Sequence, residues 1–322
     1  MIVFVTSAWH GSTVKAFVER SFGFDHPTCL NFNYHTFFRK QTCPVATYVF
    51  TDMERLSAWE LEPAARLFDF LRSKGLRCLN NPARVRTRVE LLRLLAAKGI
   101  SDIGVWRADE APRPRKFPVF IRGEHDHAYP VSKLIKDQND LDEELDRIRE
   151  DGHSLRGLIV LEHRPAPYDG GLFHKWGAFR IGDSVSVDHL AVDSTWLVKY
   201  GDYALLNDDI IGDEHDAVMT NRDADELMSI FDAADIEYGR ADYAIIDGRL
   251  TIYEINTNPN IVNYVPAKNP ISLEKQRRAC ERLAAGLYSI DTEQEGHVDL
   301  DIEHGFFQRL RHNPSDVPFW RR

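Results

Sequence analysis

The stretch GRADYAIIDGRLTIYEINTNP, residues 239–259, is the part of the chain that decides its fold. Its apolar and β-branched residues stand on both sides of an Asp-Gly pair at 247–248, which is a strong hairpin signal. We therefore predict two antiparallel strands over residues 241–256. Glu254 and Asn256 close the second strand and share one face, because side chains two residues apart in a strand point the same way.

The register of this hairpin decides whether Asp242, on the first strand, joins that face. A strict two-residue turn pairs Asp242 with Tyr253 and places it opposite to the face of Glu254. A three-residue loop or a β-bulge pairs Asp242 with Glu254 instead, and Arg240 with Asn256. Two carboxylates and an amide oxygen are the hard ligands that Mg²⁺ takes, often while it bridges to phosphates. From these residues alone, an ordinary hairpin with solvent-facing charges is an equal alternative.

The composition argues against several classes of protein. A chain of 322 residues suits two or three packed subdomains. The net charge of −10, with no long basic run, disfavours an electrostatic nucleic-acid binder. The opening MIVFV predicts a first strand and not a signal peptide, and no later apolar run is long enough to cross a membrane. Four separated cysteines without a CxxC pair indicate reduced thiols, so we expect a cytoplasmic protein without nucleic acid or membrane as partner.

The periodicity of the remaining residues predicts an α/β unit followed by two lobes that mix helices and strands. The predicted strands are 2–6, 46–51, 76–79, 117–123 and 155–163, with a further hairpin over 173–192 about Gly182-Asp183. The predicted helices are 56–74, 84–98, 224–234 and 273–288. A further helix is predicted around the apolar stripe Leu141, Leu145 and Ile148. The tail from Asp291 onward yields no functional prediction.

The order R-x-D, hairpin, E-x-N-x-x-P over residues 239–259 resembles the closing motif of ATP-grasp enzymes. The relevant relatives are carboxylate–amine ligases of the type of glutathione synthetase, D-alanine ligase and the ligase that adds glutamate to a ribosomal protein. This resemblance implies that Asp242, Glu254 and Asn256 hold Mg²⁺ on the phosphates of ATP. It also implies that Arg240 lies near the transferred phosphate.

Earlier segments resemble the nucleotide-binding parts of the same family, so that the likeness covers roughly residues 80–265. NNPARVRTRVELLRLLAAKGI (80–100) has Arg88 at the basic position of the entry helix, where lysine is usual. FPVFIRG (117–123) has Arg122 in place of the phosphate-binding lysine. Arginine keeps the charge and adds a planar fork, so that phosphate binding is retained with an altered contact geometry.

Two further segments complete the implied ATP site. LIVLEH (158–163) resembles the hinge strand, so that Glu162 and the backbone of His163 are implied to hold the adenine edge. Asp169 follows at a distance that suits the ribose hydroxyls. STWLVKYGD (194–202) resembles the segment whose lysine meets the terminal phosphate, which points to Lys199.

The lid departs from the family pattern, because GEHDHAY (123–129) stands where a glycine-rich loop is usual. His125 and His127 are either a lid or substrate contact or, less convincingly, part of a zinc site that lacks its other ligands. His10 follows the first strand and is either a surface residue or a substrate contact. Lys175 is either a phosphate or substrate contact or a half-exposed residue beside Trp176.

The fold that these expectations describe is an α/β ATP-grasp fold with a pre-ATP-grasp domain. Its predicted units are 1–80, a central lobe with the lid at 81–160, a C-terminal lobe with the Mg²⁺ and ATP site at 161–290, and a tail at 291–322. The implied reaction activates a carboxylate as an acyl phosphate and joins it to an amine, with ATP and Mg²⁺ as cofactors. A kinase acting on a small-molecule hydroxyl and a catalytically degenerate nucleotide-binding protein are the alternatives. A carboxylate and an amine are the expected substrates, small molecules or peptides, and a homodimer is a further possibility.

Overall fold

The computed structural model of the chain describes residues 1–322 except 9, 20–24, 126–128, 261–266 and 313–322. For residues 17–19, 169 and 310–312 it describes the backbone alone. His127, one of the two lid histidines considered above, therefore lies outside the described residues.

The N-terminal unit is built on a parallel sheet of strand order β2-β1-β4-β5. Its strands are β1 (Ile2–Thr6), β2 (Cys29–Asn33), β4 (Thr47–Phe50) and β5 (Cys78–Leu79). Strands β1 and β4 are buried at every position, as expected for a parallel sheet covered on both faces. The chain leaves β1 toward β2 on one side and later adds β4 on the other, so the crevice at the carboxyl ends of β1 and β4 is a topological switch point.

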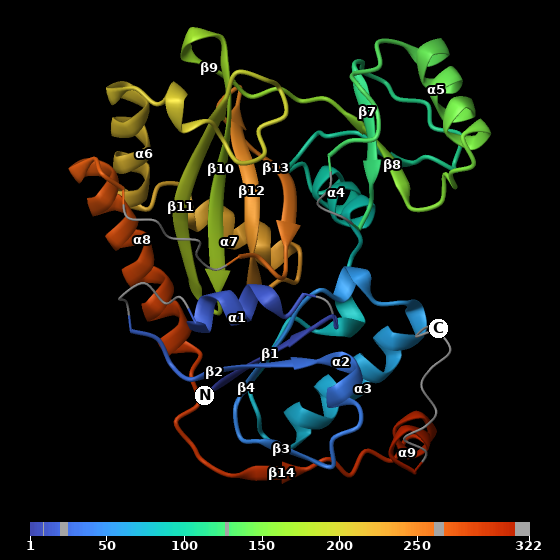
Figure 1. The fold of residues 1–322 in the computed structure, drawn as a ribbon, viewed down its shortest axis with the longest axis vertical. Helices are drawn as coiled ribbons and strands as arrows, with labels where there is room; N and C mark the ends of the chain where they lie inside the picture. The colour runs from blue at the N-terminus through green and yellow to red at the C-terminus, as the bar shows by residue number, and fades with distance from the viewer. Residues whose placement is uncertain (9, 20–24, 126–128, 261–266, 313–322) are drawn as a thin grey trace.

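Helices and the end of a hairpin cover the two faces of this sheet (Figure 1). One face packs on α2 (Tyr34–Phe37) and α3 (Ala58–Ser73), through a cluster that includes Phe50 and Phe68. The other face packs on α1 (Ser12–Glu19) and on residues of the C-terminal unit such as Tyr238. The N-terminal unit and the C-terminal unit therefore share a hydrophobic cluster.

The central lobe carries a three-stranded antiparallel sheet of order β6-β8-β7. It consists of β6 (Val105–Arg107), β7 (Val119–Gly123), β8 (Leu158–Glu162) and the helices α4 (Arg88–Ala97) and α5 (Gln138–Glu150). Strand β7 alternates, so that Val119 and Ile121 pack beneath α5 while Phe120 and Arg122 face the C-terminal unit. Thr87 caps α4 in a capping box with Glu90, which fixes where that helix begins and hence where Arg88 lies.

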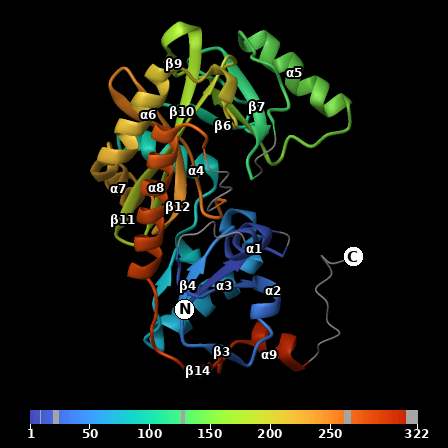
Figure 2. The same cartoon turned by 60° about the vertical axis from the view of Figure 1, so that its left-hand side comes forward.

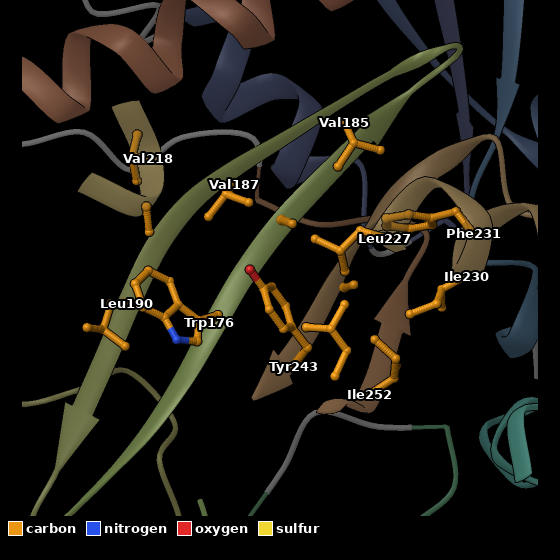
Figure 3. Packing of buried hydrophobic residues seen from close by; sticks show 14 of the residues in the cluster. Trp176, Val185, Val187, Leu190, Val218, Leu227, Ile230, Phe231, Tyr243 and Ile252 are labelled. Atoms are coloured by element: carbon orange, nitrogen blue, oxygen red, sulfur yellow. The ribbon is translucent and has the colours of Figure 1, made fainter. Parts of the chain in front are cut away.

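The C-terminal unit is an antiparallel sheet of order β11-β10-β12-β13. Its strands are β9 (Pro167–Tyr168), which pairs with β10, then β10 (Leu172–Ile181), β11 (Ser184–Asp193), β12 (Tyr238–Ile246) and β13 (Arg249–Asn256). The helices α6 (Asp208–Thr220) and α7 (Ala224–Ala233) bury one face of the sheet against Trp176, Tyr243 and Ile252 (Figure 3). On the opposite face, Phe179 and Ile181 pack toward the N-terminal unit, and polar side chains such as Lys175 and Asp242 occupy the part beside the central lobe.

The last part of the chain returns to the N-terminal unit. Helix α8 (Pro270–Ser289) runs along the side of the molecule from the C-terminal unit to the parallel sheet (Figure 2). After it, β14 (His297–Asp299) pairs with β3 (Thr42–Pro44), and α9 (Gly305–His312) packs its Phe307 into the core of the N-terminal unit. The segment that follows α8 is thus part of the hydrophobic core of the N-terminal unit.

The expectation of an α/β fold is confirmed by these sheets, and every strand and helix predicted above is present within a few residues. Elements that the sequence did not predict include α1, β2, α2, β3, β6, α6, β14 and α9. The four cysteines are free thiols. In the described part of the chain, no helix has the length and apolar character needed to span a membrane.

Candidate functional site

A β-bulge sets the register of the β12–β13 hairpin. The turn itself has two residues, Asp247 and Gly248, both with positive φ as a type I′ turn requires. Ile246 pairs with Arg249, but the register then shifts, and Asp242 pairs with Glu254. The hairpin therefore has the bulge that the sequence analysis gave as one of two alternatives, and not the three-residue loop.

The bulge separates a core face from a polar face along one strand. Ile252 pairs with Tyr243 and lies in the core, whereas Glu254, two residues on, pairs with Asp242 on the opposite face. In a regular strand these two residues would point the same way. Tyr253 is the extra residue, and its hydroxyl donates to the carbonyl of Arg164 at 3.0 Å. The bulge thus lets one strand supply both packing and polar ligands.

Cationic side chains already surround the two carboxylates. Lys175 Nζ lies 2.8 Å from Asp242 Oδ2, and Arg240 Nη1 donates to Asp242 Oδ1 at 3.1 Å. Arg88 pairs with Glu254 through Nη2 and donates through Nη1 to the carbonyl of Gly123 at 3.2 Å. Three cations therefore face these two carboxylates, and Asp188 beside Arg240 supplies a third negative charge.

A second bulge positions Arg240. The register of β10 and β11 shifts between Gly177 and Ala178, and Asp188 Oδ1 lies 3.5 Å from Arg240 Nε. Burial opposes the charge of the guanidinium, but the carboxylates of Asp188 and Asp242 outweigh it and raise the pKa of Arg240. Gly177 provides the space, since a Cβ there would lie 1.9 Å from Arg240 Nη2. Arg240 thus stays charged above the sheet.

A pocket opens between the central lobe and the C-terminal unit, with about 770 Å³ of empty space including its open mouth. One end is apolar and aromatic, where Trp196 lies 5.1 Å from Phe120 and 5.0 Å from His163 between ring centroids. Burial lowers the pKa of His163, which keeps its ring neutral near neutral pH. The other end is lined by charged groups, namely Arg88, Arg122, Lys175, Asp242 and Glu254. An apolar slot that leads to charges suits a nucleotide, whose flat base is apolar and whose phosphates are anionic.

Glu162 and His163 are the residues implied to contact adenine, and Asp169 is the one implied to contact the ribose. Glu162 lines the pocket, but its carboxylate accepts hydrogen bonds from the backbone N–H groups of Gly104 and Lys116 at 3.2 and 3.0 Å. The N–H of His163 donates to the carbonyl of Pro118 at 2.9 Å. Glu162 therefore holds the rim of the pocket together. The side chain of Asp169 lies outside the described residues, so its expected ribose contact stays a prediction.

A wider cleft continues from the pocket toward the N-terminal unit, with about 1730 Å³ of empty space. Arg122 lines both spaces. Lys199 lines the cleft, with its Nζ 4.0 Å from the ring centroid of Tyr129 and 5.4 Å from that of Tyr200. Lys199 is thus held by cation–π contacts beside the lid. The described lid histidine, His125, lines a different pocket, with its Nε2 3.8 Å from Glu124 Oε2.

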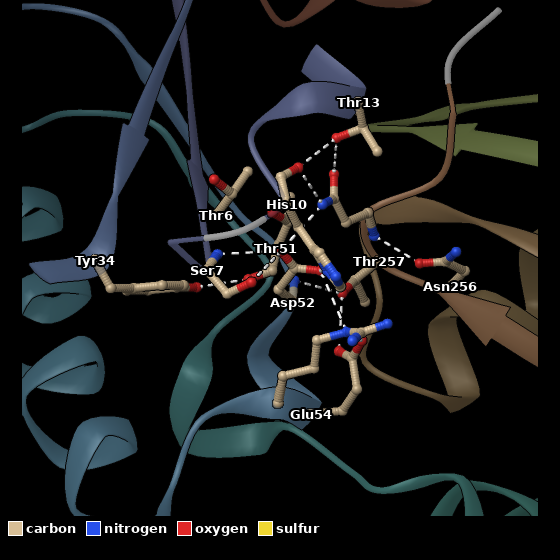
Figure 4. Close-up of polar contacts among 12 residues, drawn as sticks. Thr6, Ser7, His10, Thr13, Tyr34, Thr51, Asp52, Glu54, Asn256 and Thr257 are labelled. Atoms are coloured by element: carbon tan, nitrogen blue, oxygen red, sulfur yellow. Dashed lines mark hydrogen bonds and ion pairs between the residues drawn. The ribbon is translucent and has the colours of Figure 1, made fainter. Parts of the chain in front are cut away.

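The far wall of the cleft belongs to the N-terminal unit, and Asn258 links it by hydrogen bonds to one candidate ligand, Asn256 (Figure 4). Asn256 Oδ1 accepts from the N–H of Asn258 at 2.8 Å. The side chain of Asn258 in turn donates to Asp52 Oδ2 at 3.0 Å and to the carbonyl of His10 at 3.1 Å. Asp52 and Asn258 were not predicted from the sequence, because neither belongs to a spacing pattern with chemical meaning.

The donor set fits a hard divalent cation. Asp242 and Glu254 are cross-strand neighbours, Asn256 follows on the same face, and all three line the same cleft. Two carboxylates and an amide leave coordination positions for water and phosphate, as Mg²⁺ prefers. Within the described residues, no group of three or more His, Cys, Asp or Glu side chains is placed to hold a metal ion.

Comparisons with known proteins give similarity at the level of solved structures. No family model and no curated protein matches the chain. The chain is similar to D-alanine–D-alanine ligase from Bacillus anthracis complexed with ATP, with 13% identity and a TM-score of 0.47 over 90% of this chain and 97% of that one. It is also similar to an L-amino acid ligase from Bacillus licheniformis, with 10% identity and a TM-score of 0.43 over 89% and 76% of the two chains.

A third similar structure is a RimK domain ATP-grasp protein from Sphaerobacter thermophilus. It shares 14% identity and a TM-score of 0.43, over 89% of this chain and 99% of that one. At these identities and TM-scores the similarity carries no argument about single residues, and the role of each residue has to be argued from its own contacts.

Proposed function

We propose that this protein is an ATP- and Mg²⁺-dependent ligase that activates a carboxylate as an acyl phosphate and joins it to an amine. The observation that carries the proposal is the bulged hairpin, which gathers Asp242, Glu254 and Asn256 on one face beneath Arg88, Lys175 and Arg240. An apolar pocket leads to this cluster from one side and a wide polar cleft from the other. The resemblance of the closing motif, residues 239–259, to that of ATP-grasp enzymes supports the ligation of a carboxylate and an amine.

The residues of the two spaces suggest where each substrate binds. The aromatic slot of Phe120, His163 and Trp196 takes the base of ATP, and the phosphates extend toward Arg122 and Lys175. The pocket and the cleft share six residues, namely Arg122, Lys175, Leu197, Val198, Asp242 and Glu254. The terminal phosphate therefore lies at this shared wall, with the carboxylate substrate on the side of the cleft.

Catalysis in this arrangement is mainly positioning and neutralisation of charge. Bound Mg²⁺ supplies a positive charge on the phosphate oxygens. Arg240 and Lys175 take up the negative charge that develops as the phosphoryl group passes to the carboxylate, and Arg122 holds the group from the central lobe. Asp242 and Glu254 would hold the metal ion, and their present partners Arg88, Lys175 and Arg240 would then be available to the phosphates.

The proposed role of Glu254 as a Mg²⁺ ligand can be tested directly with Glu254→Gln. We expect the Mg²⁺-dependent part of ATP affinity to fall and turnover to drop by about 10²-fold or more, because a ligand that fixes the phosphates is lost. ATP affinity in EDTA should change little, since the aromatic slot and the cations remain. The measurements are titration calorimetry with and without Mg²⁺, and ADP release with a panel of amino acids.

Glu226→Gln is the matched control, because Glu226 is an exposed carboxylate on α7, away from the cleft. It should behave as wild type in both assays. Equal Mg²⁺ dependence and equal ADP release in wild type and Glu254→Gln would contradict the proposed site. A phosphorylated product without any release of free phosphate would point to a kinase instead.

A further inference from the structure

A histidine and an aspartate lie at the carboxyl edge of the parallel sheet, on the wall of the cleft that faces the shared phosphate region. His10 follows β1 and Asp52 follows β4, the two neighbouring strands at the switch point of the sheet. Ligands of open α/β sheets bind in the crevice at such a place. Both residues line the cleft. The position of this pair therefore points to a role toward a ligand.

The carboxylate of Asp52 is fixed from several directions (Figure 4). Its Oδ2 accepts hydrogen bonds from the N–H and the hydroxyl of Ser7 and from Nδ2 of Asn258, each at 3.0 Å. The residue adopts a left-handed backbone with φ of 53°, and its N–H donates to Thr257 Oγ1 at 3.1 Å. Asp52 is 2% exposed. With Oδ2 occupied, the oxygen that faces His10 is Oδ1.

Asp52 orients the ring of His10. Nδ1 of His10 lies 3.3 Å from Asp52 Oδ1, so the favoured neutral tautomer carries its proton on Nδ1 and leaves the lone pair on Nε2. The backbone is held as well, because the carbonyl of His10 accepts from Thr13 Oγ1 at 2.9 Å and from Asn258 Nδ2 at 3.1 Å. The side chain is nevertheless 34% exposed. A fixed imidazole with an accessible lone pair is the arrangement of a general base.

The pair lies next to the candidate ligands of Mg²⁺. Asn258 links the two places, since its N–H donates to Asn256 Oδ1 while its side chain donates to Asp52. Among the charged groups around the pair, Arg55 Nε lies 3.8 Å from Asp52 Oδ1, and Lys175 and Arg240 lie across the cleft. His10 is therefore on the side of the phosphate region away from the nucleotide pocket, where a second substrate has to arrive.

We propose that His10, oriented by Asp52, accepts a proton from a primary ammonium group, and that the amine formed in this way is the nucleophile that attacks the acyl phosphate. The inference rests on the proposed ligase function. One ammonium proton passes to Nε2 of His10, and the freed lone pair forms the C–N bond. The C–O bond to phosphate breaks, and its electron pair leaves with the phosphate. The second of the three ammonium protons leaves with the phosphate, as part of hydrogen phosphate, and the third remains on the amide nitrogen. His10 then returns its proton to solvent.

The test separates activation of the carboxylate from attack by the amine. Enzyme, ATP, Mg²⁺ and a pool of proteinogenic amino acids with D-alanine are incubated with or without hydroxylamine. Hydroxylamine is largely a free base near neutral pH, so it traps an acyl phosphate as hydroxamate without help from a proton acceptor. For His10→Gln we expect hydroxamate at the wild-type rate, but amide formation slower by about 10²–10⁴-fold, the usual contribution of a general base. Mass spectrometry identifies the amide.

His153→Gln is the matched control, because His153 is exposed beyond α5 and remote from the cleft. It should leave both rates unchanged. A wild-type rate of amide formation in His10→Gln would overturn the role of His10 alone. Absence of hydroxamate with wild type would contradict the proposed function itself, and the two failures are therefore distinguishable.

A measurement that needs no substrate tests the geometry. In ¹⁵N-histidine spectra, with His10→Gln used for assignment, the neutral ring of His10 should be protonated on Nδ1. In Asp52→Asn this preference should weaken, while amide formation falls and hydroxamate formation does not. Protonation of the neutral ring on Nε2 in the wild type would contradict Asp52 as a positioning residue.

Discussion

At the residue scale, one buried asparagine joins the N-terminal and C-terminal units. Asn80 is 1% exposed and has a left-handed backbone with φ of 61°. Its Nδ2 donates to the carbonyls of Phe50 and Tyr238 at 3.0 and 2.8 Å, and its Oδ1 accepts from the N–H groups of Glu237 and Tyr238 at 2.8 and 3.0 Å. The amide thus uses all four of its hydrogen-bonding positions.

We expect Asn80→Ala to lower the free energy of unfolding by about 3 kcal/mol, because it leaves buried backbone groups without partners. Unfolding in urea, followed by fluorescence and circular dichroism, measures the change. Asn81→Ala is the control, since Asn81 caps the short helix η2 (Pro82–Arg84) through one hydrogen bond to the N–H of Ala83, and it should cost about 1 kcal/mol. Equal effects of the two variants would contradict the special role of Asn80.

Gly177 is a second residue whose identity follows from its surroundings. We expect Gly177→Ala to displace the guanidinium of Arg240 from Asp242 and to weaken ATP binding by about tenfold, the effect of one altered charge-assisted contact. Stability should change little, because the atom that must move is the end of a flexible side chain. Calorimetry and thermal unfolding measure both quantities.

Gly212→Ala is the control for that substitution. Gly212 lies inside α6 with open space around its Cα, so alanine should raise helix stability by about 0.5–1 kcal/mol and leave ATP binding as it is. If Gly177→Ala bound ATP as wild type does, the space at Gly177 would not matter for the phosphate site.

At the scale of elements, the hairpin illustrates what a sequence can and cannot predict. The Asp-Gly turn and the alternating residues on both sides are local signals, so both strands and the shared face of Glu254 and Asn256 were predictable. The bulge at Tyr253 was foreseen only as one way to bring Asp242 to that face. The role of Lys175 could not be decided from the sequence, because its ion pair with Asp242 forms only where β10 pairs with β12.

A buried ion pair joins three elements behind the cleft and leads to a pH-dependent prediction. Glu214 on α6 pairs with Lys275 on α8, and its Oε1 lies 3.3 Å from Nδ1 of His189 on β11. Burial alone would raise the pKa of Glu214, but the hydrogen bond from His189 and the charge of Lys275 prevail and lower it to about 2. A depressed pKa contributes stability above the unfolded value of 4.5, and this stability is lost as the pH falls toward about 2.

We expect Glu214→Gln to be clearly less stable than wild type at pH 6, because Lys275 is then buried without its carboxylate. The difference should shrink by about 1 kcal/mol between pH 6 and pH 3.5, since the wild type loses part of the contribution of Glu214 in that interval. Urea unfolding across this range measures it. A difference that grew toward acid pH would contradict the lowered pKa.

At the scale of the whole molecule, the two ends of the chain complete one core. Phe307 of α9 is fully buried and meets Phe38 edge to face, with ring centroids 5.7 Å apart. The N–H of Leu300 donates to the carbonyl of Gln41 at 2.7 Å, and β14 pairs with β3. The sequence did not predict this return, because a short amphipathic segment carries no mark of a partner more than 250 residues away.

We expect Phe307→Ala to destabilise the protein by about 3–5 kcal/mol through the cavity that it leaves in the first core. Limited proteolysis should then cut first within the N-terminal unit, and thermal unfolding should begin earlier. Glu303→Ala, at an exposed position of the same segment, should be neutral. A proteolysis pattern like that of the wild type would show that α9 contributes little to this core.

The pairing of β3 with β14 also has a consequence for biosynthesis. The ribosome makes the parallel sheet well before β14 and Phe307, which complete its core. The nascent N-terminal unit therefore keeps an uncovered apolar surface until β14 and α9 have been synthesised, a state that exposes it to aggregation and to chaperones. The unit that is synthesised first is therefore not the first to have a complete hydrophobic core.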